Sequence, residues 1–398
     1  MNGRLLASVF ALAMFAEPAA AAPAGSPDLG GAYSSFGFAL LAKVRAEHPA
    51  DNVFVSPVSV ALALAMTAVG AGGTTRAAIL KTLGASDTPM ASFENANASL
   101  LASLADHGKD LQLSVANAIW LNQKFAIEPQ FVSATHDAFG ASAENLAFGQ
   151  PAAAQTINDW VKTHTSGLIP AIVGSTDASE AAILTNAVAM KAKWAQQFKK
   201  DSTHDAPFHP SQGAPVTVSM MAQTANFKYA SADGWQMARL PYCCDDRFAM
   251  YVVLPSPGHD PGATLTALSG GAFDRAIASL SEQRMLFEMP RYTATFQTRL
   301  NDPLAQMGMG VAFGDAADFS HLVAPPARAA ISDVNHRVFV RVDEEGTQAA
   351  AATSVGITMM ALPAPPPVRM IVDRPFVMAI RDDRTRQLLF LGVVTSPK

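Results

Sequence analysis

The sequence predicts a large domain of the α+β class, in which helices and strands are segregated rather than regularly alternating. Helix-like segments gather in the first half of the chain, and strand-like segments dominate from about Thr217 onward. No internal repeat, charge run or Ser/Gly-rich linker divides the chain behind its N-terminal segment. With 49% hydrophobic and 15% charged residues, the composition is that of a well-packed globular protein. We therefore expect one domain over residues 22–398.

The N-terminal segment predicts export. Arg4 precedes an apolar run from Leu5 to Ala16, and alanines fill positions 19–22. One positive charge, a short apolar run and small residues in this order are typical of a secretory signal peptide. The run is too short to cross a bilayer as a helix, so we expect no membrane anchor. Residues 1–21 should be removed, and the mature protein should reside in the periplasm or outside the cell.

Three segments carry helix signals. Ser56 and Pro57 read as an N-cap followed by proline at the first helical position, and the apolar segment behind them stops at Gly70. Because that helix is apolar nearly all round, it should be buried. Two further helices are expected, one from about Thr74 to Leu83 that ends at Gly84, and one carrying Ile157, Trp160 and Val161 that ends at Gly167.

Strand signals are of two kinds. Leu111, Leu113 and Val115 alternate with polar or small neighbours, which predicts a strand with one buried face. The segment from Phe248 to Leu254 is continuously apolar, which predicts a strand buried on both faces.

The sequence carries no motif of a common hydrolase or nucleotide-binding enzyme. The patterns G-x-S-x-G, S-x-x-K and H-E-x-x-H and the P-loop are absent, which leaves open only a triad defined by geometry. The nine histidines are scattered, and the closest pair, His204 and His209, lacks the further ligands of a zinc site. The net charge of -5 offers nucleic acid no basic surface. We expect no enzyme, no metal, no cofactor and no nucleic-acid partner.

The cysteines do not supply cross-links. Cys243 and Cys244 are the only two and are adjacent, so a bond between them would be strained. The pattern indicates neither a catalytic nor a metal site. The fold of this exported chain should therefore be stable without disulfides.

The segment behind Arg337 is the most informative part of the chain. A strand alternating apolar and charged residues up to Val342 runs into Asp343 to Gln348 and then into small residues up to Thr353. Two interpretations follow from these residues alone. Alanine is the best helix former, so one is an alanine-rich helix from about Thr347 to Ala352 with a Pro-rich linker behind it; the other is an exposed loop.

Short motifs along nearly the whole mature chain resemble the serpin family. Each is weak by itself, but their order and spacing over about 350 residues are very specific. The motifs are Asn52 to Ser59, Ala63 to Met66, Gly70-Ala71, Thr74, Ala116 to Trp120, Ile157 to Val161, Thr165 to Ile169, Asn186-Ala187, Lys191, Lys193-Trp194, Phe198, Met220-Met221, Leu240 to Tyr242, Leu254-Pro255, Ala317 to Ser320, His336, Gly346-Thr347, Asp373 to Phe376 and Phe390 to Gly392.

The resemblance implies a fold of three β-sheets with eight or nine helices and an exposed reactive-centre loop, here about residues 344–368. In inhibitors of this family a protease cleaves the loop and forms an acyl-enzyme. The cleaved loop then inserts as a new strand of the largest sheet and carries the attached protease with it, which distorts the protease before deacylation. The inhibitor supplies conformational energy, and the protease supplies the chemistry.

The family's hinge maps onto residues that suit burial in a sheet. Every second inserted side chain must enter the buried face, and here those are Thr347, Ala349, Ala351 and Thr353. None is charged or bulky, so insertion would bury no unsatisfied group. Gln348 replaces the usual glutamate at an outward position. The full implied hinge is Glu344, Gly346, Thr347, Ala349, Ala350, Ala351, Ala352 and Thr353.

The family's counting along the loop places the scissile bond between Met360 and Ala361, fourteen residues after Gly346. Methionine suits an apolar primary pocket, so the expected partner is a serine protease of the elastase, chymotrypsin or subtilisin type. The stretch from Ala361 to Pro375 is a few residues longer than usual, which leaves Met359 and Leu362 as alternative sites.

The resemblance also implies a region where the sheet opens, formed by Ser56, Asn186, His336 and Trp194. Buried polar groups are costly unless they bond to one another, so Ser56, Asn186 and His336 should form a network. Ordinary core packing is the alternative for each residue. Met190, Ala189 and Ala192 depart from the family pattern, which predicts looser packing of the sheet beside them.

Two functional classes follow besides an enzyme. The first is an inhibitor, expected to be a monomer. The second is a non-inhibitory serpin that acts as a binding or chaperone module. Non-inhibitory relatives commonly carry charged, bulky or proline residues in the hinge, and this chain does not, so the hinge favours the inhibitor.

Overall fold

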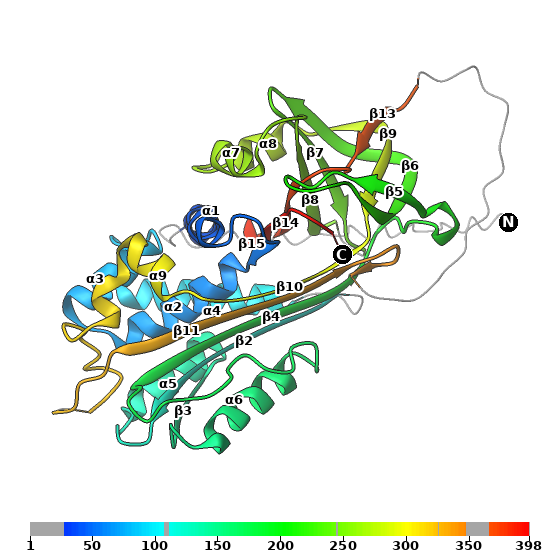
Figure 1. Ribbon diagram of the computed structural model, residues 1–398. Helices are drawn as coiled ribbons and strands as arrows, with labels where there is room; N and C mark the ends of the chain where they lie inside the picture. Colours follow the sequence, from blue (N-terminus) through cyan, green and yellow to red (C-terminus); the bar gives the residue numbers. More distant parts are fainter. Residues whose placement is uncertain (1–27, 107–110, 244–245, 325, 348–365, 398) are drawn as a thin grey trace, which may run out of the picture.

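The computed structural model describes residues 28–106, 111–243, 246–324, 326–347 and 366–397 (Figure 1). The expected signal peptide, the bond between Met360 and Ala361, the hinge residues Ala349 to Thr353, and Cys244 lie outside these ranges. At Thr347 the backbone is described but not the side chain.

Nine α-helices are present in the described ranges, in agreement with the eight or nine expected. Six of them precede residue 165, as the α+β prediction requires. They are α1 (Leu29–Glu47), α2 (Pro57–Gly70), α3 (Gly73–Thr82), α4 (Met90–Ala105), α5 (Pro129–Phe139), α6 (Pro151–His164), α7 (Pro261–Ala267), α8 (Ala272–Ala278) and α9 (Asn301–Leu304).

The helix signals locate α2, α3 and α6. Helix α2 is buried at every position except Val69, because its surface is apolar all round. Its N-cap residue Ser56 makes no side-chain capping bond. Helix α6 ends at His164, three residues before the expected stop. Gly167 instead closes the cap, since its N–H donates to the carbonyl of Lys162 at 2.7 Å.

The sheet that contains the hinge has six strands, in the order β10-β11-β4-β2-β3, with β12 also paired to β4. Strands β10, β11, β4 and β2 run side by side along the molecule in Figure 1. The central pair, β4 and β11, is parallel, whereas β4 pairs with β2 in the antiparallel sense. The strands are β2 (Leu111–Asn122), β3 (Ser142–Leu146), β4 (Ala182–Lys193), β10 (Tyr292–Arg299), β11 (Ile331–Val342) and β12 (Gly346–Thr347).

The other nine strands form one hydrogen-bonded sheet, so the described chain has two sheets where three were expected. The reason is strand β6, whose seventeen residues pair with β5 and β9 along the first part and with β7 at the end. Two groups of strands are thereby joined. The strands are β1 (Val53–Val55), β5 (His204–Phe208), β6 (Val216–Ala232), β7 (Trp235–Pro241), β8 (Phe248–Pro255), β9 (Ser281–Pro290), β13 (Val368–Ile371), β14 (Phe376–Asp382) and β15 (Gln387–Val394).

Helices cover both faces of the six-stranded sheet. Ile119 and Leu121 of β2 belong to the main hydrophobic core, to which α2 contributes. Trp120, between them, packs on the opposite face in a second core with Ile157 and Val161 of α6. This alternation follows from the two-residue period of a strand. A strand added to this sheet therefore meets an apolar core on each face.

Candidate functional site

The hinge leaves the sheet through a tight turn at the end of β11. The N–H of Asp343 donates to the carbonyl of Gly346 at 2.9 Å, and the N–H of Gly346 donates back to the carbonyl of Asp343 at 3.2 Å. The chain therefore reverses direction within four residues. Gly346 and Thr347 begin a new strand, β12. Residues 348–365, for which a helix and linker were the alternative to a loop, lie outside the described ranges.

Strand β12 occupies the edge of β4 that faces β11. The ladder between β4 and β11 ends at Ala189 and Phe339. Farther along β4, Ala192 pairs with Leu111 of β2 on one side and with Thr347 on the other. Because a strand has only two edges, β12 lies on the same edge of β4 that pairs with β11 up to Ala189. The hinge has therefore formed the first rungs of a strand between β4 and β11.

Gly346 is required for this close approach. Its φ angle of +137° is one that residues with a side chain rarely adopt. A Cβ atom at this position would lie 2.2 Å from the carbonyl oxygen of Ala192 and 2.6 Å from the Cα of Lys193. Both contacts are with backbone that cannot move without breaking β4. Any other residue would force β12 away from the sheet.

Trp194 holds the turn in place. Its indole Nε1–H donates to the carbonyl of Asp343 at 2.9 Å, and its backbone N–H donates to the carbonyl of Glu345 at 3.0 Å. Its ring stacks on Tyr242 with centroids 4.6 Å apart. Trp194, which the family resemblance assigned to the sheet-opening region, thus contacts the turn that leads into β12.

The acidic residues of the turn bind partners from several elements. Thr203 donates to a carboxylate oxygen of the buried Glu344 at 2.8 Å, with Arg291 3.7 Å from the same oxygen. Lys200 lies 2.6 Å from Glu345, and this carboxylate raises the pKa of Lys200. Lys200, Thr203 and Arg291 were not predicted from sequence, because nothing in their neighbourhood signals contact with residues more than fifty positions away.

The expected polar network forms at mid-sheet. His336 of β11 donates through Nδ1–H to the Oδ1 atom of Asn186 on β4 at 2.5 Å, and its Nε2 accepts the backbone N–H of Ser56 at 3.1 Å. Ser56 thus contributes its backbone, while its buried hydroxyl has no partner within the described residues. Asn186 also donates to Ser59 and to Asn117.

Ser59 and Asn117 complete this network and were missed by the sequence analysis. Asn117, Asn186 and His336 stand in register across β2, β4 and β11. Strand register depends on pairing between distant segments, which no local pattern reveals. Trp194 directly follows the last residue of β4 and is eight residues from Asn186, or about 26 Å at the rise of a strand. The predicted sheet-opening region is therefore two separate sites on one seam.

The charge state of His336 makes the seam sensitive to acid. Burial lowers the pKa of His336 to about 3, whereas histidine in an unfolded chain titrates near 6.5. Between these values the unfolded chain binds a proton that the folded chain does not, so stability falls as pH drops through this window. Each pH unit of acidification within this window should raise the equilibrium constant for unfolding by up to about tenfold through His336 alone.

Urea unfolding at pH 8, 6, 5 and 4 measures this effect. His336→Gln should be less stable at pH 8 but lose less stability than the parent between pH 6 and 4. Equal pH slopes for the two proteins would assign the acid sensitivity to other groups.

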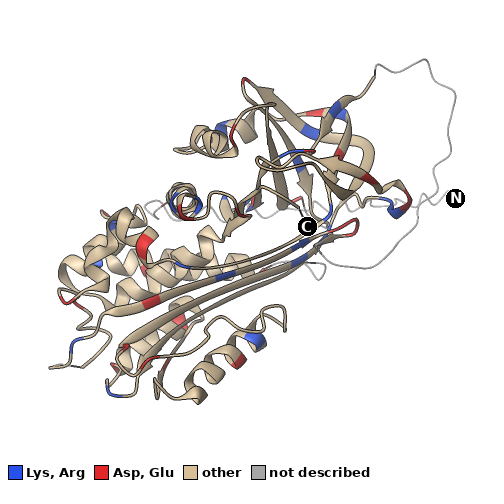
Figure 2. Ribbon diagram, viewed as in Figure 1, with Lys and Arg blue, Asp and Glu red and all other residues tan. Residues whose placement is uncertain are grey.

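Other kinds of site were sought in the described part of the chain. No group of three or more His, Cys, Asp or Glu side chains could hold a metal ion there. Among the described helices, none is both long and apolar enough to span a membrane. In Figure 2 acidic and basic residues are interspersed over the ribbon rather than collected in a stripe of one sign.

Comparisons with known proteins agree with this geometry. A family model described as Serpin (serine protease inhibitor) matches residues 31–397. An uncharacterized serpin-like protein of Thermococcus kodakarensis is 33% identical over 370 residues, which cover 92% of this chain and 85% of the relative. The leukocyte elastase inhibitor of Sus scrofa is 32% identical over 381 residues, covering 93% and 99%. Human thyroxine-binding globulin, solved with its ligand, superposes with a TM-score of 0.86 at 26% identity, covering 93% and 98%.

Proposed function

This chain belongs to the serpin family, and on that premise we propose that it traps a serine protease by offering the bond between Met360 and Ala361 as a substrate. The protease serine attacks the carbonyl carbon of Met360. The peptide bond breaks, Ala361 leaves with the amine, and Met360 remains as an ester on the protease. Insertion of the freed loop then carries the protease away before water can hydrolyse the ester.

One observation carries this proposal: β12 already pairs with β4 on the side that faces β11. The residues that would follow Thr347 into the same gap are uncharged up to Thr353, and all of them except Gln348 are small. Each added residue extends a strand that has begun. A cleaved loop therefore needs no separate nucleation event to enter the sheet.

The pairing geometry favours insertion once the loop is free. At present β4 and β11 bond to each other in parallel. An inserted strand continuing β12 would be antiparallel to β4, and hence also to β11. One parallel ladder would be replaced by two antiparallel ladders, which are somewhat more stable per residue. The existing ladder between β4 and β11 must first be broken for this exchange to occur.

The target follows from the residue before the bond. Methionine at position 360 suits an apolar primary pocket, so the partner is a protease of the elastase, chymotrypsin or subtilisin type. Met359 and Leu362 are alternative sites of the same chemical character. The inhibitor acts as a monomer without a cofactor. The N-terminal segment supports export to the periplasm or outside the cell.

Incubation with a protease panel tests the proposal. Chymotrypsin, elastase and subtilisin should each give a covalent complex that survives boiling in SDS, whereas trypsin, whose pocket carries an aspartate, should not. Mass spectrometry should show that the released C-terminal fragment begins at Ala361. Clean cleavage with no complex from any of these proteases would contradict inhibition and favour a binding or chaperone module.

A further inference from the structure

A pocket of about 160 Å³ lies behind the hinge, between Trp194 and the strands β6 and β7. Its floor is apolar and is formed by Trp194, Phe227, Leu240 and Pro241, of which the first three are buried. Cavities of about 150 Å³ with apolar walls can hold a benzene-sized molecule. The volume and floor therefore suit one aromatic ring or two fused rings.

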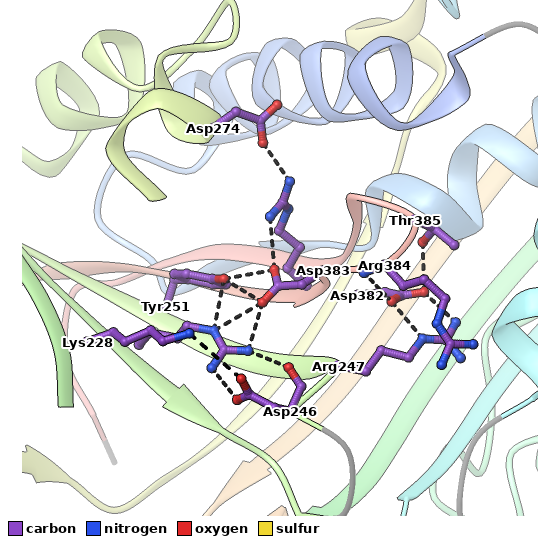
Figure 3. A network of polar contacts seen from close by, with 11 residues as sticks. Lys228, Asp246, Arg247, Tyr251, Asp274, Asp382, Asp383, Arg384 and Thr385 are labelled. Atoms are coloured by element: carbon purple, nitrogen blue, oxygen red, sulfur yellow. Dashed lines mark hydrogen bonds and ion pairs between the residues drawn. The ribbon is translucent and has the colours of Figure 1, made fainter. Parts of the chain in front are cut away.

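Charged groups at the rim are already paired with one another. Arg239 donates to Asp246 at 2.5 Å and to Asp383 at 2.9 and 3.0 Å. Lys228 lies 3.8 Å from Asp246. Figure 3 shows Lys228 and Asp246 at one end of this chain of contacts, which continues through Asp383. Two cations and two anions, Glu282 included, line the pocket, so a charged ligand would gain no uncompensated partner.

The rim also offers uncharged hydrogen-bond acceptors. Asn226 donates its amide N–H to Glu282 at 2.9 Å, and Gln223 donates to the carbonyl of Gln196 at 3.5 Å. Neither of these two side-chain amide oxygens accepts a hydrogen bond from the described part of the chain. A ligand with an N–H or O–H group would therefore find an acceptor above the apolar floor.

We propose that this pocket binds a small uncharged aromatic molecule that carries one hydrogen-bond donor, and that the bound molecule slows loop insertion. Trp194, in the floor of the pocket, donates hydrogen bonds to the carbonyls of Asp343 and Glu345. A ligand packed on this ring stabilises the arrangement in which the hinge has entered by only two residues. The regulatory effect rests on the proposed inhibitory function, whereas binding does not.

Equilibrium dialysis of the full-length protein against indole tests the binding site. A ligand of this size should bind with a Kd on the order of 1 mM. 1-Methylindole, which lacks the donor, and the charged analogues indole-3-carboxylate and tryptamine should each bind at least about fivefold more weakly. Absence of indole binding up to about 10 mM, or equal binding of all four probes, would overturn the proposal.

A matched pair of variants on β6 locates the site. Asn226→Trp places a large side chain at the rim of the pocket, and Thr224→Trp places the same side chain at an exposed position outside it. Asn226→Trp should reduce indole binding at least about tenfold, and Thr224→Trp should leave it unchanged. Equal binding by both variants would place the ligand elsewhere.

The rate of complex formation with the best protease of the panel tests the regulatory effect. Saturating indole should slow it severalfold in the parent and in Thr224→Trp but not in Asn226→Trp. Indole binding with an unchanged rate would overturn the regulatory effect. If the protein forms no complex with any protease, the inhibitory function fails, while the dialysis result still decides on the pocket.

Discussion

Thr347→Arg should convert the protein from an inhibitor into a substrate. Thr347 is the second residue of β12, and its backbone partner Ala192 is buried. Strand alternation predicts that the side chain at position 347, now at the open end of the gap, becomes fully enclosed in the buried face when the residues behind it insert. An unpaired charge there costs on the order of 3 kcal/mol or more, which slows insertion more than about 100-fold. The protease then hydrolyses the acyl-enzyme ester before the loop has inserted.

The stoichiometry of inhibition measures this effect. The parent should need close to one inhibitor per protease, and Thr347→Arg at least about ten, with cleaved inhibitor as the main product. Gln348→Arg is the matched control: strand alternation predicts an outward-facing side chain at this position after insertion, so the variant should retain most of the inhibition. A Thr347→Arg variant as efficient as the parent would refute insertion of this loop.

Cleavage of the loop should make the protein far more resistant to heat. Thr347 to Met360 span fourteen residues, which would become a strand with neighbours on both sides. Replacing one ladder by two adds roughly ten hydrogen bonds at about 1 kcal/mol each. For a chain of this length each kcal/mol raises Tm by about 2 °C, so the expected rise is roughly 20 °C.

Differential scanning calorimetry of intact and cleaved protein checks this expectation. Cleavage by a protease that is afterwards removed keeps the two samples otherwise identical. Cleaved Thr347→Arg should gain much less stability than the cleaved parent, because its insertion is impeded at the first buried position. A cleaved parent that melts no higher than the intact chain would show that the loop stays outside the sheet.

Much of the fold could be predicted because its signals are local. Pro57, Gly70 and the apolar residues between them define α2, and the continuous apolar run from Phe248 defines β8. The joining of two groups of strands into one sheet could not be predicted. It depends on which partners β6 finds along its length, and these partners lie far away in the sequence.

The site was predictable only as far as the family resemblance reaches. Asn186 and His336 were expected to meet, and they do. Asn117 was missed although it stands in the same row, because one asparagine in a strand looks like any other until register is known. The role of Ser56 was predicted in kind but not in detail, since its backbone rather than its hydroxyl takes part.

The row of Asn117, Asn186 and His336 also indicates where the sheet can open. Asn186 is tied to Asn117 across an antiparallel ladder of eleven residue pairs but to His336 across a shorter parallel one. Breaking the hydrogen bond between His336 and Asn186 separates no pair of ionic charges, because the imidazole is neutral. The six-stranded sheet can therefore separate between β4 and β11, where its pairing is shorter. A new strand can therefore enter between β4 and β11 without breaking the longer ladder between β4 and β2.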